Sequence, residues 1–231
     1  MEKRGPKPKG AINVVWSANF AYAIGLLVTD GCLSKDGRHI DFTSKDLDQI
    51  NNFQKCLGIN LKIGKKNNSR GSSAFRVQIG DVLFYKFLQE IGLAQAKSLI
   101  LNEIKVPEIH FFDFLRGCFD GDGSSYSYWD PRWKSSFMFY VEFSSASKLF
   151  IYWIMGEIKK KVGVMGIITK SKSKNPCYLL RYAKKSGLEI IKKMYYNPNV
   201  VCLPRKLKKI KKTLKIDKKQ QKLYSINARV V

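Results

Sequence analysis

Apolar residues recur with helical spacing from Ser17 to Thr29, and the stretch ends at Asp30-Gly31. This period predicts a helix with a serine N-cap at its start and a glycine just past its end. One stripe of the helix is small, because Ala21, Gly25 and Thr29 follow one another at intervals of four residues. A helix with such a stripe can pack closely, backbone to backbone, against a similar partner.

The pattern returns 92 residues later (122 − 30), where a second apolar stretch ends at Asp122-Gly123. Gly117 stands at the place of Gly25, and Gly117 and Gly121 form the matching small stripe. If the two helices pack against each other through these stripes, their final aspartates lie side by side. An internal repeat in two copies predicts a pseudo-twofold dimer fused into one chain.

Period-two alternation and turn residues divide the rest of each copy into strands and helices. In the first copy we predict strands over 33–36, 38–44, 61–66 and 74–79, and helices over 46–57 and 82–91. In the second copy we predict strands over 124–129, 137–144, 167–172 and 178–183, and helices over 148–162 and 188–195. The predicted fold is therefore α+β, with two αββαββα repeats, the small-striped helices at the centre and two antiparallel sheets that form a saddle.

The predicted boundaries are residues 1–12 for a basic, flexible tail, 13–108 for the first repeat and 109–231 for the second. We interpret the tail as solvated, although its Arg4-Gly5-Pro6 leaves a minor-groove contact open. The run from Arg205 to Lys222 contains ten basic residues around one apolar stripe. This pattern predicts a basic helix that contacts phosphates without reading sequence.

Charge narrows the choice of partner. The 231 residues include 42 Lys and Arg against 18 Asp and Glu, and the resulting net charge of +24 repels itself in a compact fold unless a polyanion compensates it. Nucleic acid is the leading partner. The apolar run of the first motif, Phe20 to Val28, is too short to span a bilayer, so no membrane association is expected.

Five cysteines occur without a Cys-x-x-Cys pair, and the amino-terminal residues do not form a secretory signal. We therefore expect an intracellular protein, in a bacterial or archaeal cytoplasm or in an organelle. Its thiols should be reduced and mostly buried.

The segments 23–31 and 115–123 resemble the two motifs of single-chain LAGLIDADG homing endonucleases. The segments 92–98 and 203–206, after the last helix of each repeat, also resemble theirs, and the likeness runs from about residue 17 to about residue 215. Val28 departs from the pattern, because the first motif often has an acid there and the second copy keeps it as Asp120. The resemblance implies a monomeric enzyme without an obligate protein partner. It would cut both strands of a long, non-palindromic double-stranded DNA, leave 3′ overhangs and promote intron homing.

Asp30 and Asp122 are the predicted catalytic metal ligands. Carboxylates are hard oxygen donors that suit Mg²⁺, and an aspartate at the negative end of a helix dipole calls for a compensating cation. The alternative is that both residues merely end their helices. The resemblance adds the backbone carbonyls of Thr29 and Gly121 as ligands, and it implies that Mn²⁺ substitutes for Mg²⁺ while Ca²⁺ binds without supporting efficient cleavage.

Four further residues are candidates for the catalytic pocket. Lys97 and Lys206, at matching places in the two repeats, would stabilise charge at the scissile phosphates. Ser44 and Ser145, just beyond two strands, would hold pocket waters. The chain has only two histidines, so a zinc site or a serine triad lacks its parts.

The predicted DNA-reading surface is the polar face of the strands. Alternation separates Arg76 and Gln78 from their apolar neighbours, and these side chain types pair with guanine and adenine in the major groove. The full set of predicted DNA contacts, in the strands and in the loops beside them, is Ser34, Asp36, Arg38, His39, Asp41, Thr43, Lys62, Lys66, Arg70, Arg76, Gln78, Tyr126, Tyr128, Arg132, Tyr140, Glu142, Ser144, Lys170, Lys172 and Arg181. An RNA maturase or a non-cleaving nucleic-acid-binding protein on the same fold is the alternative function.

Overall fold

A computed structural model describes residues 10–67, 73–133, 135–172 and 176–227. The first half contains α1 (Ala18–Asp30), β1 (Gly31–Leu33), β2 (His39–Ser44), α2 (Leu47–Leu57), β3 (Gly64–Asn67), β4 (Ser73–Gly80) and α3 (Val82–Glu90). A short 3-10 turn, Glu108–His110, leads into the second half. That half contains α4 (Phe111–Asp122), β5 (Ser124–Trp129), β6 (Phe137–Ser145), α5 (Lys148–Val162), β7 (Ile167–Lys170), β8 (Tyr178–Ala183), α6 (Lys184–Met194) and α7 (Pro204–Asn227). The predicted order of elements is confirmed.

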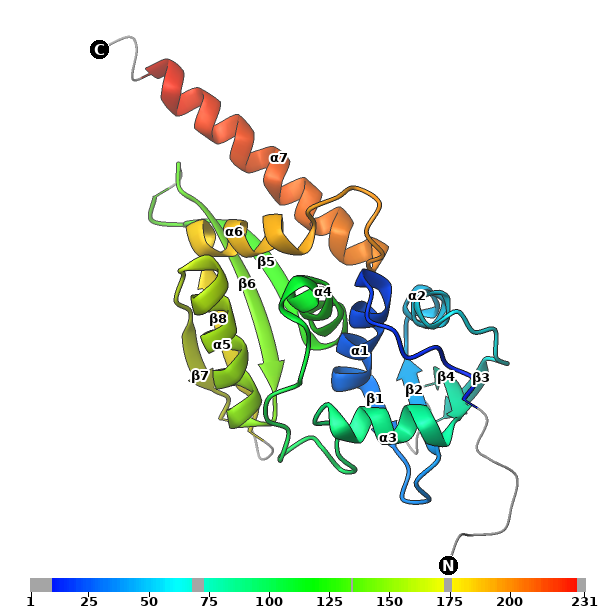
Figure 1. The fold of residues 1–231 in the computed structure, drawn as a ribbon. Coiled ribbons are helices and arrows are strands. Elements are labelled where there is room, and N and C mark those ends of the chain that lie inside the picture. Colours follow the sequence, from blue (N-terminus) through cyan, green and yellow to red (C-terminus); the bar gives the residue numbers. More distant parts are fainter. Residues whose placement is uncertain (1–9, 68–72, 134, 173–175, 228–231) are drawn as a thin grey trace, which may run out of the picture.

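The two halves form separate four-stranded antiparallel sheets with the same topology, β1-β2-β4-β3 and β5-β6-β8-β7. Helices α2 and α3 pack on one face of the first sheet, and α5 and α6 pack on one face of the second. Figure 1 shows α1 and α4 at the centre, with one sheet on each side. Apolar residues of alternate strand positions, such as Phe42 and Val77 or Phe143 and Leu180, are buried under the helices.

Helices α1 and α4 touch backbone to backbone at their glycines. A Cβ atom built on Gly25 would come within 2.2 Å of the carbonyl oxygen of Phe114, and one built on Gly117 would come within 2.2 Å of the carbonyl oxygen of Tyr22. The contact is reciprocal, because each partner is offset by the same 92 residues (114 − 22 and 117 − 25). Such exchange of equivalent partners is the property of a twofold interface.

A buried arginine ties the segment between α6 and α7 to α4. Arg116 is 1% exposed and donates to the carbonyl oxygens of Met194 (2.7 Å) and Val201 (2.9 Å). Its remaining nitrogen pairs with Asp113 at 2.8 Å. Because every charged group here has a partner, the burial is tolerated and the route of the chain into α7 is fixed.

Several predicted boundaries were wrong. The first strand is Gly31–Leu33 rather than 33–36, because the next residues form a turn in which Asp36 accepts the backbone N–H groups of Arg38 and His39. Helix α6 begins at Lys184 rather than 188, since Gly187 does not break it but lies against Val141.

Two expectations about the surface also need correction. Ile12, assigned to the tail, is 6% exposed, and its backbone N–H donates to Asp81. Among the five free cysteines Cys56 and Cys118 are buried, but Cys32 is exposed because its position in β1 points away from the core. Within the described ranges, no helix is both long enough and apolar enough to cross a membrane.

Candidate metal centre and nucleic-acid interface

Asp30 and Asp122 are the last residues of α1 and α4, and both helices end abruptly at an extended glycine. A side chain on Gly123 would meet Phe119 within 2.7 Å, so the turn at the end of α4 requires glycine. A Cβ atom at Gly121 would lie 2.9 Å from the Asp30 carboxylate, which therefore sits against the end of the opposite helix. The close helix contact thus brings the two aspartates together at one end.

The environment of each aspartate disfavours its negative charge. Burial, and secondly the charge of Asp122, raise the pKa of Asp30 to about 6. Burial also raises the pKa of Asp122, against the lowering effect of Lys206 and Lys97. A cation between the two carboxylates would offset both the burial and the repulsion.

Gln49 of α2, absent from the predicted set, is a neighbour of Asp30. Its Nε2 donates to Asp30 Oδ2 at 3.3 Å, and its Oε1 accepts the hydroxyl of Ser44 at 2.7 Å. Ser44 also accepts the backbone N–H of Asp46 at the start of α2. Ser44 therefore orients Gln49, which in turn touches the carboxylate. A polar residue on the buried face of the 46–57 helix was the available signal, although Gln54 gives the same signal.

A small cavity of about 120 Å³ lies on the other side of the centre. Its lining includes Lys97, Asp122 and Ser145, so these three predicted site residues are brought together. Ser144, a predicted DNA contact, donates to the carbonyl oxygen of Asp122 at 2.8 Å. The open face of the second sheet therefore borders Asp122 directly.

The two predicted lysines cap the ends of the central helices. Lys206 is 9% exposed, and its Nζ lies within hydrogen-bonding distance of four backbone carbonyl oxygens, those of Phe119 (2.5 Å), Asp120 (2.8 Å), Gly121 (3.2 Å) and Gly123 (2.7 Å). Lys97 is 8% exposed and contacts the carbonyl oxygens of Thr29, at 3.5 Å, and Gly31. Burial lowers the pKa of Lys206 to about 8 and also lowers that of Lys97.

These contacts change the expected roles. Thr29 and Gly121, predicted as metal ligands through their carbonyls, each share that oxygen with a lysine. Lys97 follows Ala96, whose φ of 50° lies in the left-handed region, so a strained backbone presents the lysine. A lysine that satisfies the last carbonyls of a helix also opposes the negative end of its dipole.

Asp120 is a structural residue of the second copy. It is fully buried, and its Oδ2 accepts the hydroxyl of Tyr22 at 2.8 Å and the backbone N–H of Leu203 at 2.6 Å. Burial raises the pKa of Asp120. Its carboxylate joins α1, α4 and the start of α7. Val28, at the same place in the first copy, is buried as well.

The uncovered face of the first sheet carries paired polar side chains. Register and alternation place His39, Asp41, Thr43, Lys66, Arg76 and Gln78 on it. Arg76 donates to Asp41 from Nε (2.9 Å) and Nη2 (2.6 Å). Cys32, opposite Asp41, is an outward residue that the sequence prediction missed.

The uncovered face of the second sheet is aromatic. Tyr126 and Tyr140 stack with ring centroids 5.1 Å apart, and Tyr128 extends the stack at 6.1 Å from Tyr140. Arg181 lies over two of the rings, 5.8 Å from the centroid of Tyr126 and 5.9 Å from that of Tyr140, and it pairs with Glu142 at 2.6 Å. The two faces therefore present different chemistry at corresponding places.

Several predicted DNA contacts lie elsewhere. Lys170 pairs in register with Tyr178, which packs against the core, so Lys170 belongs to the helix-covered face and that prediction was wrong. Arg132 pairs with Asp130 in the β5–β6 turn. The other predicted DNA contacts that lie outside the strands are Ser34, Asp36, Arg38, Lys62 and Lys172. Arg70 lies outside the described residues.

The turn position of Asp36 has an electrostatic consequence. Its hydrogen bonds to His39, first through the ring and then through the backbone N–H, lower the pKa of Asp36 to about 2. Its carboxylate is engaged within the turn, so base contact from this residue requires a change of partners.

Comparison with known proteins identifies the fold. The family model for the LAGLIDADG-like domain matches residues 17–92. The homing endonuclease I-WcaI bound to its DNA recognition sequence superposes with a TM-score of 0.57 at 15% identity, over 84% of this chain and 88% of that one. I-DmoI in complex with DNA and Mn gives 0.52 at 14% identity, over 78% and 97%.

Full-length DUF199/WhiA from Thermatoga maritima is also similar, with a TM-score of 0.55 at 16% identity, over 94% of this chain and 69% of that one. The search of curated proteins gave no significant match. Identities this low establish the fold alone. The chain has the LAGLIDADG homing endonuclease-like fold, with both repeats carried in a single chain.

Proposed function

We propose that this protein is a site-specific endonuclease that hydrolyses both strands of a long, non-palindromic double-stranded DNA, works as a monomer and promotes intron homing. One observation carries the proposal: Asp30 and Asp122, each at the end of a central helix, lie close enough to repel each other, between the two sheets (Figure 1). A fold that only bound nucleic acid would gain nothing from two partly buried, mutually repelling carboxylates.

The two carboxylates suit Mg²⁺. Mn²⁺ should substitute for it, whereas Ca²⁺ should bind without supporting efficient cleavage. A divalent ion held by Asp30 and Asp122 would lower the pKa of an attacking water and stabilise the leaving 3′ oxygen. The chain supplies the remaining parts. Gln49 holds Asp30 in orientation, and Lys97 and Lys206 offset negative charge at the centre.

The two sheet faces would read the target. Arg76 and Gln78 on the first sheet and Arg181 and Glu142 on the second are base-edge readers by chemistry. Because the tyrosine stack of the second face has no counterpart among the strands of the first, the two half-sites should differ in sequence. This supports a non-palindromic target.

A non-cleaving DNA-binding protein, or an RNA maturase, is the competing function. The carbonyl contacts of Lys97 and Lys206 favour it, because they stabilise the helix ends without any metal. Both WhiA and the homing endonucleases have this fold, so the fold alone does not distinguish a nuclease from a protein that only binds nucleic acid.

Selection from a randomised duplex library in Mg²⁺ tests the proposal and identifies the target. On that target, Asp30→Asn and Asp122→Asn should each abolish cleavage of at least one strand while DNA affinity stays within a few-fold. Asp48→Asn, at an exposed α2 position, is the matched control and should cut normally. If both single variants still cut both strands, or if no duplex in the library is ever cut, the protein is not this nuclease.

A further inference from the structure

Helix α7 carries a strongly cationic surface that the catalytic centre and the sheet faces do not use. Between residues 208 and 219 every exposed side chain is a lysine, namely Lys208, Lys209, Lys211, Lys212, Lys215, Lys218 and Lys219, and we call this set the lysine face. Asp217 is the only acidic residue of α7, and it is 5% exposed and paired inward with Lys184 at 2.6 Å. The lysine face therefore has no acid from its own helix.

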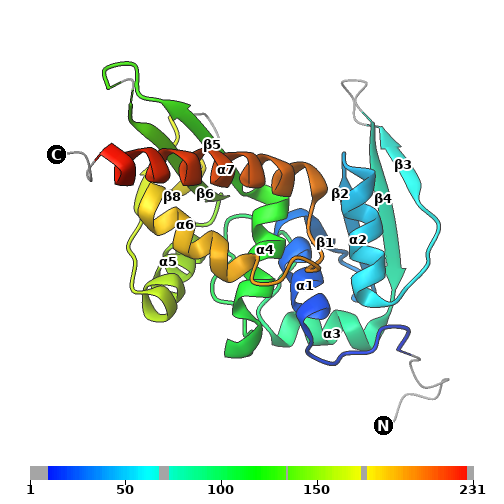
Figure 2. The same cartoon turned by 90° about the horizontal axis from the view of Figure 1, so that it is seen from above.

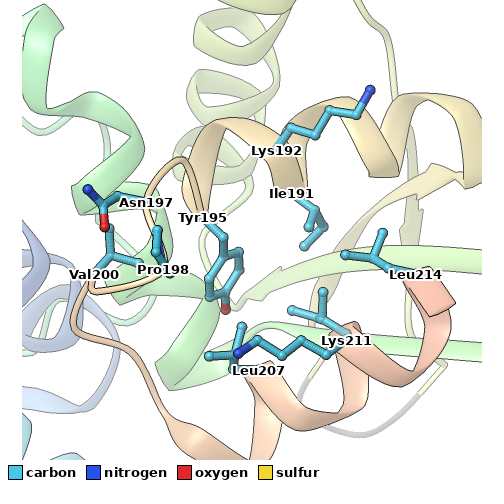
Figure 3. A pocket seen from close by; sticks show the side chains of 10 residues that line it. Ile191, Lys192, Tyr195, Asn197, Pro198, Val200, Leu207, Lys211 and Leu214 are labelled. Carbon is cyan, nitrogen blue, oxygen red and sulfur yellow. The ribbon is translucent and has the colours of Figure 1, made fainter.

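Both apolar and polar contacts hold the helix in place, and Ile210, at 1% exposure, belongs to the core. Thr213 meets Ser127 of β5 at 3.3 Å, and Gln220 donates to the carbonyl oxygen of Ser135. Figure 3 shows the cavity that remains between α6, the 195–200 segment and α7, with a volume of about 190 Å³. Tyr195 reaches into this space, and its buried hydroxyl has no hydrogen-bond partner among the described residues.

The lysine face is electrostatically costly in the free protein. Lysines three and four positions apart, such as Lys208 and Lys212, or Lys215 and Lys219, repel one another on the helix surface. A polyanion removes this repulsion. The apolar residues beside the lysines, Leu207, Leu214 and Ile216, are all partly buried, so the fully exposed positions offer none of the apolar side chains that a membrane-surface helix inserts.

The linear charge density of the lysine face is of the same order as that of duplex DNA. From Lys208 to Lys219 the helix rises about 17 Å, so seven cations give roughly one charge per 2.4 Å. Duplex DNA carries one negative charge per about 1.7 Å of its axis. The helix also starts at the catalytic centre, where Lys206 contacts Gly121, and from there it runs along the second repeat (Figures 1 and 2).

We propose that the lysine face of α7 binds the phosphate backbone of duplex DNA, independently of sequence, alongside the second repeat. The inference rests on the DNA-binding part of the proposed function but not on cleavage. It adds a contact outside the two sheet faces and makes the footprint of the protein longer on the side of the second repeat.

The test measures affinity for a labelled 30-bp duplex without a target site, in metal-free buffer, across a series of salt concentrations. In one variant Lys208, Lys212, Lys215 and Lys219 are changed to Gln. Each lost phosphate contact should reduce the slope of log affinity against log salt by about 0.9. We expect a reduction of about 2 to 4, and the same four positions changed to Arg should restore the slope.

The control variant changes four exposed lysines on other helices, Lys55, Lys86, Lys148 and Lys159, to Gln. It removes the same net charge as the lysine-face variant. Its slope should fall short of the wild-type slope by at least 1 less than the slope of the lysine-face Gln variant does. Equal slopes for the two Gln variants would overturn the inference and leave the proposed function standing. Loss of binding to an RNA hairpin with unchanged duplex binding would assign the face to RNA instead. Absence of duplex binding by the wild type would overturn both proposals.

Discussion

Gly25 and Gly117 face each other across the contact of α1 with α4, and the built Cβ of Gly25 lies 2.9 Å from the Cα of Gly117. A methyl group at either position has only backbone to displace, so the helices themselves must move apart. The contact that brings the two aspartates together thus depends on the absence of two side chains.

Gly25→Ala or Gly117→Ala should lower the free energy of unfolding by about 3 kcal/mol or more, because overpacking against backbone cannot relax through a rotamer change. Gly156→Ala on α5 is the matched control, since a Cβ there meets nothing within 4 Å. In a helix interior this change should raise stability by about 0.5–1 kcal/mol. Chemical denaturation of the three variants measures both effects, and a small loss at Gly25 equal to that of a surface site would contradict the close contact.

Asp30→Asn should stabilise the metal-free protein at neutral pH while removing its cleavage. Burial raises the pKa of Asp30 to about 6 in the folded protein, against 3.8 for an unperturbed aspartate, so between these values the folded state holds a proton that the unfolded state has lost. Stability from this group therefore falls as pH rises through the window, by up to about 3 kcal/mol.

The measurement is the difference in unfolding free energy between Asp30→Asn and wild type, in the presence of a chelator. It should be near zero around pH 3.5 and largest above pH 7, and added Mg²⁺ should reduce it by stabilising the wild type. A difference that does not vary with pH would argue against the buried, charge-repelled carboxylate.

Lys206→Met removes an ammonium group from four carbonyl oxygens at the end of α4. Unsatisfied buried carbonyls should cost on the order of 1–3 kcal/mol of stability. If Lys206 also offsets charge during strand cleavage, the cleavage rate at saturating Mg²⁺ should fall by about 10²-fold or more, and this is the expected outcome. Met at exposed Lys193 of α6 is the control, and a normal rate for Lys206→Met would restrict the lysine to helix capping.

Two buried tyrosine hydroxyls should respond in opposite ways to removal. Tyr22 donates to Asp120 at 2.8 Å, so Tyr22→Phe leaves a buried carboxylate short of a donor and should cost about 1–3 kcal/mol. The buried hydroxyl of Tyr195 lacks a partner among the described residues, so Tyr195→Phe should be neutral or slightly stabilising. Thermal unfolding distinguishes the two, and a loss of similar size at both positions would place an unseen partner at Tyr195.

The repeat made the centre of the fold predictable. Gly25 and Gly117 align at a fixed offset, and small residues on both helices permit close packing, so the approach of Asp30 to Asp122 could be predicted from the sequence. Strand alternation likewise sorted Arg76 from Val77, because a residue's face in a strand depends on parity alone.

Partners distant in sequence were not predictable. Lys206 contacts a carbonyl 87 residues earlier, and nothing in the local pattern distinguishes a buried helix cap from a lysine at a phosphate. Gln49 was missed because its significance comes from Asp30, on another helix. Lys170 was assigned to the wrong face because alternation in a short strand separates two sets of residues without saying which set faces the core.

The uneven distribution of tyrosine and tryptophan over the two sheets should give the two halves different intrinsic fluorescence. Three stacked tyrosines and the exposed Trp133 of the β5–β6 turn belong to the second repeat, whereas the described strands of the first sheet contain neither tyrosine nor tryptophan. DNA that covers the second sheet should therefore change the intrinsic ultraviolet emission, while engagement of the first sheet leaves it nearly silent. The order in which the two halves dock can be followed in unlabelled protein.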